Sequence, residues 1–84
     1  MDSLTKREDE IISDLAVAMK FKFRLHKNKG SWERKDHSQL LKELQREITE
    51  LIKAPDKESI VLEAADCANY LAMIIDLAHR RGIK

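Results

Sequence analysis

Two pairs of acidic residues have a spacing that would place both side chains of each pair on one face of a helix. Glu47 and Glu50 form the first pair, and Glu63 and Asp66 form the second. Residues three apart on an α-helix project from nearly the same face, so the two carboxylates of each pair could bind one cation. Asn69 follows Asp66 at the same interval. Such oxygen ligands favour Mg²⁺, with Mn²⁺ as a substitute, over zinc.

The surroundings of the two pairs differ. Glu47 and Glu50 lie among other charged residues, where a solvated surface is the simpler interpretation of that pair taken alone. Glu63 and Asp66 lie in a mostly apolar run, where an uncompensated carboxylate would be costly. A basic residue of the first helix, Arg24 or Lys27, could compensate them, and a divalent cation is the alternative.

Three helices must position these acids, because apolar residues recur at helical spacing and only one proline and two glycines interrupt the chain. The first predicted helix runs from an N-cap at Ser3 to about His26. Its expected inner face consists of Leu4, Ile11, Ile12, Leu15, Ala18, Met19 and Phe23. The second spans about 37–53 behind an Asp36 cap, with Glu47 at the margin of its apolar stripe.

The third predicted helix follows Pro55, is capped by Asp56 and continues to about Arg80. It is apolar on nearly every side, so we expect the first two helices and a copy from another subunit to surround it. An 84-residue chain buries little surface alone. The sequence therefore predicts one all-α domain, residues 1–84, whose helical bundle is completed by homo-oligomerisation.

A basic segment at residues 27–36 carries the only tryptophan. Lys27 and Lys29 could remain in a solvated loop, and Trp32 could close the end of the small core. The histidines lack the spacing of a nitrogen-rich metal site and are expected at the surface: His26, His37 and His79.

Composition limits the class of protein. The 16 Lys and Arg balance 15 Asp and Glu, which argues against a dedicated nucleic-acid binder. Cys67 is the only cysteine, so we expect it to pack as a small hydrophobe in a reducing compartment. The polar start and the acids of the apolar run favour a soluble, cytoplasmic protein over a secreted or membrane protein.

The acidic pairs also belong to a longer pattern. The segment LLKELQREITEL carries ExxE, twelve residues intervene, and VLEAADCANYLAMI carries ExxD, with KNKGSW upstream at residues 27–32. This order resembles the MazG-like all-α nucleoside triphosphate pyrophosphohydrolases, in particular the small forms of phages and mobile elements. The resemblance covers about residues 26–76.

The resemblance implies hydrolysis of nucleoside or deoxynucleoside triphosphates between the α and β phosphates, giving a monophosphate and pyrophosphate in a house-cleaning role. It implies Mg²⁺ held by Glu47, Glu50, Glu63 and Asp66. Glu47 or Glu50 would orient or deprotonate the attacking water, and Asn69 would contact substrate or a metal ligand. With such a substrate, Lys27 and Lys29 would contact phosphate oxygens and Trp32 would stack on the base. The family also suggests a homodimer or a dimer of dimers.

Two departures keep another class of function open. Ile48 and Thr49 stand between the first two acids, where many relatives have further glutamates, so fewer metal ions could be held. The basic segment that follows the ExxD helix in larger relatives is reduced to His79, Arg80, Arg81 and Lys84. The alternative is a non-catalytic helical dimerisation or regulatory module. Retention of all four acids favours the enzyme.

Overall fold

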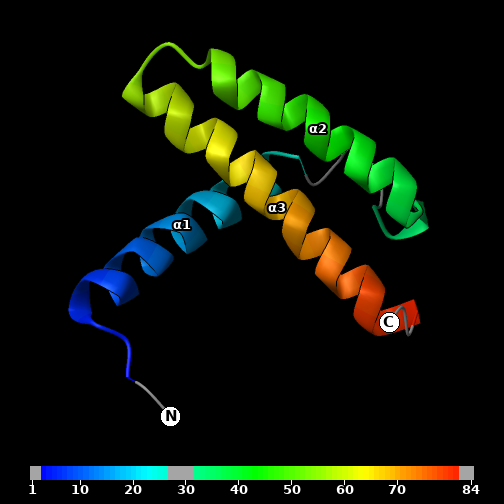
Figure 1. Cartoon of the computed structure of the whole chain (residues 1–84), viewed down its shortest axis with the longest axis horizontal. Coiled ribbons are helices and arrows are strands. Elements are labelled where there is room, and N and C mark those ends of the chain that lie inside the picture. The colour runs from blue at the N-terminus through cyan, green and yellow to red at the C-terminus, as the bar shows by residue number, and fades with distance from the viewer. Residues whose placement is uncertain (1–2, 27–31, 82–84) are drawn as a thin grey trace.

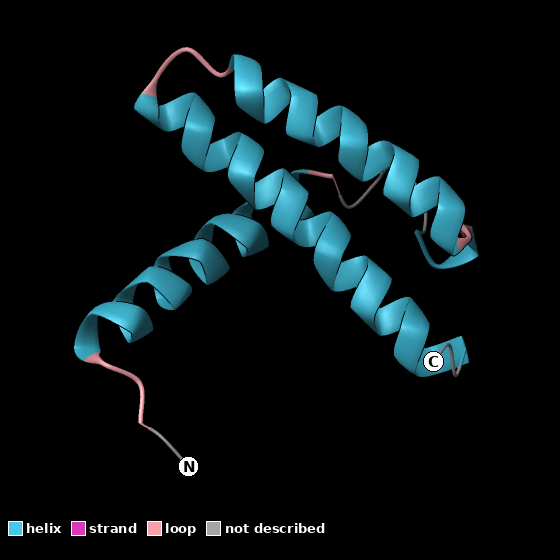
Figure 2. Ribbon diagram, in the orientation of Figure 1, coloured by secondary structure: helices cyan, strands magenta, loops and turns pink. Residues whose placement is uncertain are grey.

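The computed structural model describes residues 3–26 and 32–81, which form three packed α-helices and one short 3-10 helix. The α-helices are α1 (Lys6–Leu25), α2 (His37–Lys53) and α3 (Lys57–Arg81), and η1 (Trp32–Arg34) precedes α2. Figures 1 and 2 show α2 and α3 as an antiparallel hairpin, with α1 crossing α3 on its other side. The all-α prediction is confirmed for the described part of the chain.

Local signals set the ends of α2 and α3 where the sequence predicts them. The Asp36 carboxylate accepts a hydrogen bond from the Gln39 amide at 2.8 Å, and Asp56 accepts one from the Ser59 amide at 2.8 Å. Ala54 adopts φ −59° and ψ 123°, because the ring of Pro55 disfavours a helical conformation at the preceding residue. These caps bring the two acidic helices into one hairpin.

The predicted start of α1 is wrong by two residues. Thr5, not Ser3, is the N-cap: its hydroxyl accepts from the Glu8 amide at 3.0 Å, and the Glu8 carboxylate accepts from the Thr5 amide at 2.9 Å. This reciprocal pair requires an acceptor side chain three residues after the cap. Ser3 has Lys6 at that position, which can only donate.

The core is small and lies mainly between α2 and α3. Its buried apolar side chains are Leu40, Leu44, Ala65, Cys67 and Leu77. Cys67 is a free, buried cysteine, as its place in the apolar run predicts. No described helix has the length and apolar character needed to span a bilayer.

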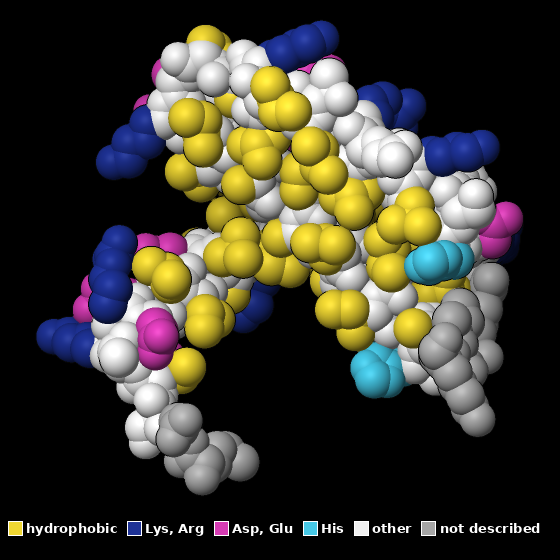
Figure 3. Space-filling view, viewed as in Figure 1, with side chains coloured by type: hydrophobic (Ala, Val, Ile, Leu, Met, Phe, Trp, Pro, Cys, Tyr) yellow, Lys and Arg dark blue, Asp and Glu magenta, His cyan; other side chains and the backbone are white. Residues whose placement is uncertain are grey.

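The expected inner face of α1 is not buried within one chain. No residue of α1 is buried, and most of the predicted face is exposed: Leu4, Ile11, Ile12, Leu15 and Phe23. The reason is that α1 packs against α3 and not against α2, and its residues before Ala16 are all exposed. Figure 3 shows apolar side chains over α1 and across the surface of the hairpin.

The third helix is likewise only partly surrounded, because Ile60, Val61, Leu71 and Ile75 are exposed.

Candidate metal centre

Three carboxylates converge where α2 faces α3. Glu47 of α2 and Glu63 and Asp66 of α3 each offer one oxygen within 4.8 Å of the others, and all three residues are half-buried. This arrangement arises because the hairpin places the inner margin of α2 opposite the ExxD face of α3. Glu50, one turn beyond Glu47, is exposed and lies outside this group. Its role as a fourth ligand stays a prediction.

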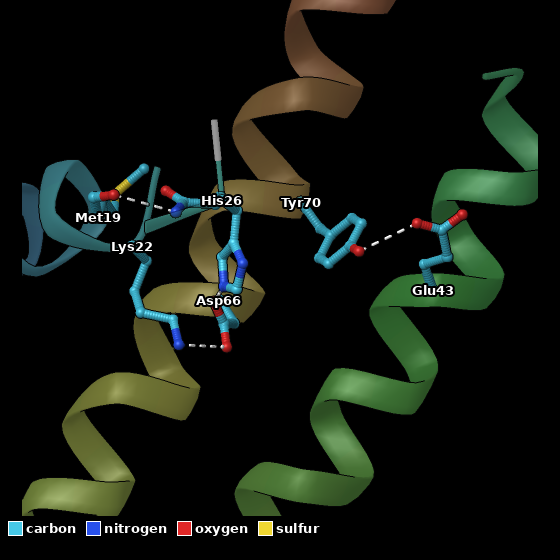
Figure 4. Close-up of polar contacts among 7 residues, drawn as sticks. Met19, Lys22, His26, Glu43, Asp66 and Tyr70 are labelled. Carbon is cyan, nitrogen blue, oxygen red and sulfur yellow. Dashed lines mark hydrogen bonds and ion pairs between the residues drawn. The ribbon is translucent and has the colours of Figure 1, made fainter. Parts of the chain in front are cut away.

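A lysine of α1 provides a positive charge beside the acids. Lys22 Nζ lies 3.2 Å from Asp66 Oδ2, and the two side chains are only 12% and 15% exposed. His26 Nε2 lies 4.0 Å from the other Asp66 oxygen, and Figure 4 shows both side chains directed at Asp66. The sequence correctly indicated a basic residue of the first helix as one possible partner. The partner that the structure shows is Lys22, which the prediction did not name. Of the two residues that it did name, Arg24 is exposed and Lys27 lies outside the described residues.

His26 lies beside the acid cluster, although its side chain is still 41% exposed. His37 and His79 are exposed, whereas His26 is half-buried beside Asp66. Lys22 and His26, the C-cap of α1, are four positions apart, which is about one helical turn, so the two basic side chains share a face of this helix. That face is the one that packs on α3.

The cluster retains an excess of negative charge. Burial, together with the neighbouring charges of Asp66 and Glu63, raises the pKa of Glu47 above its ordinary value, although Arg46 and Lys22 act in the opposite direction. Burial and the same acids also raise the pKa of the Cys67 thiol, which keeps it protonated and unreactive. A cation in the cluster would relieve this repulsion.

Asn69 adds a buried polar group one turn beyond Asp66. The residue is 4% exposed, and its Nδ2 donates a hydrogen bond to the Met19 carbonyl at 3.1 Å. This bond determines the orientation of the amide, because a flipped amide would place two oxygens together. Its Oδ1 is buried and has no hydrogen-bond partner among the described residues. A buried acceptor in this state favours a ligand that can donate.

A second polar cluster, formed by Lys35, Glu43 and Tyr70, lies beside the acids. The Tyr70 hydroxyl donates to Glu43 Oε1 at 3.0 Å, as Figure 4 shows, and Lys35 Nζ lies 2.6 Å from the same oxygen. Burial raises the pKa of Glu43, but these hydrogen bonds and the charges of Lys35 and Arg46 outweigh it, and the net shift is downward. Burial and the bond to Glu43 raise the pKa of Tyr70 to about 12. Glu43 is thus held ionised by structural partners.

These elements enclose a cavity of about 900 Å³, a size typical of ligand pockets. It is lined by Lys22, Phe23, His26, Trp32, Glu33, Lys35, Glu43, Arg46, Glu47, Asp66, Asn69, Tyr70 and Met73. Two of the three clustered acids therefore face the same space as basic and aromatic side chains. Trp32 also packs against α3, since the Arg80 guanidinium lies 5.3 Å from its ring centroid.

The structure places the predicted site residues unevenly. It brings Glu47, Asp66, Trp32 and Asn69 to the cavity, and Glu63 to the acid cluster at its edge. Lys27 and Lys29 lie outside the described residues. The sequence reasoning missed Lys22, Lys35 and Tyr70 as cavity residues. Only Tyr70 had a local signal, because it follows Asp66 by four residues and so shares its helix face.

Comparison of the chain with family models, curated proteins and solved structures finds no match. The resemblance to MazG-like enzymes is therefore carried by the motifs of this chain alone.

Proposed function

We propose that this protein is a Mg²⁺-dependent nucleoside triphosphate pyrophosphohydrolase that releases a nucleoside monophosphate and pyrophosphate. The observation that carries the proposal is the convergence of Glu47, Glu63 and Asp66 from two helices at the edge of a cavity that Glu47 and Asp66 line. The ExxE and ExxD motifs add the MazG-like resemblance.

The donor set suits a hard divalent cation. All three grouped residues offer carboxylate oxygens, which a hard cation prefers. Burial and the charges of the other two acids raise the pKa of Glu47. Asn69 Oδ1 is a further buried oxygen, without a hydrogen-bond partner among the described residues. Bound Mg²⁺ would neutralise substrate phosphates and polarise the phosphorus under attack. Glu50 is the proposed fourth ligand, and Glu47 or Glu50 would orient the attacking water.

The rest of the cavity offers groups for a nucleotide. Lys22, Lys35 and Arg46 line it and could pair with phosphate oxygens. Phe23 and Trp32 line it as well and offer aromatic rings to a base. This mixture of acidic, basic and aromatic groups favours a metal-bound phosphate ester over a simple metal store.

We further propose that a second copy of this chain covers the exposed apolar side chains of α1 and α3. Figure 3 shows a broad apolar surface on one face. Fifteen large hydrophobic side chains are exposed within the described part of the chain. In a two-fold arrangement, α1 of each copy could pack on α3 of the other and complete a bundle.

The activity is tested by incubating the protein with canonical and modified nucleoside triphosphates and Mg²⁺ while measuring pyrophosphate and monophosphate. Glu63→Gln should lower kcat/KM by about 100-fold or more. Mutation of a residue that only hydrogen-bonds to a metal ligand already lowers activity by up to about 100-fold, and Glu63 is a proposed ligand itself. Glu58→Gln is the matched control, since Glu58 is an exposed residue of the same helix outside the acid cluster.

The same exposed apolar surface favours the alternative of a helical dimerisation or regulatory module. The two functions differ in their response to metal. Absence of turnover on every nucleotide, together with no rise in melting temperature on adding Mg²⁺ or Mn²⁺, would contradict the enzyme and support the module.

A further inference from the structure

We infer that Lys22 is an exchangeable counter-ion of the metal centre. Its ammonium pairs with Asp66 in the metal-free protein and transfers to a phosphate oxygen of the substrate when a divalent cation takes that carboxylate. The inference rests on the proposed function, and it assigns a substrate-binding role to a residue outside the acidic motifs.

The first support is the geometry of Lys22. Its ammonium lies 3.2 Å from an oxygen of Asp66, a residue of the acid cluster, and its side chain is only 12% exposed. Lys22 and Asp66 also line the same cavity. An ammonium and a divalent cation would therefore compete for one carboxylate. A lysine suits this exchange because it carries a compact charge on a flexible four-carbon chain.

The second support is a separate contact that can hold α1 during the exchange. Asn69 Nδ2 donates to the Met19 carbonyl at 3.1 Å. Met19 precedes Lys22 by three residues, and Asn69 follows Asp66 by three, so the two contacts join the same helices about one turn apart. The contact between Lys22 and Asp66 involves an acid of the cluster, whereas the contact between Asn69 and Met19 does not. Lys22 can thus change partner while the other contact keeps α1 on α3.

The third support is the balance of charge. Lys22, Arg46 and His26 are the basic groups that face the three clustered carboxylates. Once Lys22 withdraws, the Arg46 guanidinium offsets one of the three negative charges and leaves an excess of two, which a divalent cation matches. That cation would also repel the ammonium, and a substrate phosphate in the shared cavity is then the available anion.

One substitution should therefore have two effects of opposite sign. Lys22→Met removes a positive charge that competes with metal, so Mn²⁺ should bind about tenfold more tightly. It also removes a phosphate partner, so pyrophosphate should bind about tenfold more weakly in saturating Mg²⁺. A merely structural lysine would not produce this opposition.

The test is calorimetric titration of the full chain with Mn²⁺ alone, and then with pyrophosphate in saturating Mg²⁺. Lys20→Met is the matched control, because Lys20 is exposed on the same helix and does not line the cavity. It should leave both affinities unchanged. Circular dichroism checks folding, and Lys22→Gln replaces Lys22→Met if the latter does not fold.

The outcomes separate this inference from the proposed function. If the wild-type protein binds Mn²⁺ but Lys22→Met leaves either affinity unchanged, or moves both in the same direction, the role of Lys22 is overturned and the metal centre stands. If the wild-type protein binds no Mn²⁺, the proposed metal centre falls, and the exchange falls with it.

Discussion

At the scale of single residues, Glu63 and Asp66 differ in what opposes their charge. Asp66 pairs with Lys22 and lies near His26, whereas Glu63 has no ion pair within the described residues. Both are half-buried in the same acid cluster. Neutralising each residue should therefore change the stability of the metal-free protein in opposite directions.

Asp66→Asn should lower the free energy of unfolding by about 1–3 kcal/mol in a chelating buffer, because it leaves a largely buried ammonium without its charged partner. Glu63→Gln should leave that free energy unchanged or raise it, because it removes like-charge repulsion. Urea denaturation measures both. A gain in stability for Asp66→Asn would show that its ion pair contributes nothing to folding.

The contact between Tyr70 and Glu43 predicts a pH-dependent effect. The pKa of Glu43 lies below its ordinary value of 4.5, so its ionised form stabilises the fold above that pH. This stabilisation is lost as the pH falls through the folded-state pKa. Tyr70→Phe removes one of the hydrogen bonds to the carboxylate, so it should cost about 1 kcal/mol near neutral pH and less in acid.

Urea denaturation of wild type and Tyr70→Phe at several pH values checks this prediction. The difference in unfolding free energy should shrink as Glu43 becomes protonated. An equal difference at every pH would show that the contribution of the Tyr70 hydroxyl does not depend on ionisation of Glu43, and it would contradict the prediction.

At the scale of elements, α1 depends on its own cap for its first half, because residues before Ala16 are exposed and receive little support from α3. Thr5→Ala should destabilise the start of this helix by about 1 kcal/mol. The effect should be a loss of helicity in circular dichroism, with little change in the melting of the α2 and α3 hairpin. Ser3→Ala is the control for the revised cap position, and an equal loss of helicity there would contradict it.

At the scale of the whole molecule, the apolar surface predicts self-association. Ile12 of α1 is 54% exposed, and a charge there should prevent burial against a second copy. In sedimentation analysis the wild-type protein should form a dimer or larger assembly, and Ile12→Glu should give a monomer. Ser13→Glu is the control: it adds the same charge at the neighbouring exposed position, which is not apolar, and it should leave the assembly intact. A monomeric wild-type protein at every concentration would refute the second-copy proposal.

The sequence by itself determined the helical class and the limits of α2 and α3. Asp36, Pro55 and Asp56 act on the backbone within a few residues, so their effects are independent of the rest of the fold. The family resemblance implied that Glu47, Glu50, Glu63 and Asp66 share one site, and the structure brings Glu47, Glu63 and Asp66 together.

Only the tertiary structure decided which cation meets Asp66 and which surface stays exposed. Lys22 and Arg24 are two residues apart and therefore point about 200° apart around α1, so the rotation of that helix selects between them. The same rotation and crossing direction leave the first half of α1 without cover. Both depend on how whole helices pack, and a broad apolar band such as that of α1 allows several such packings.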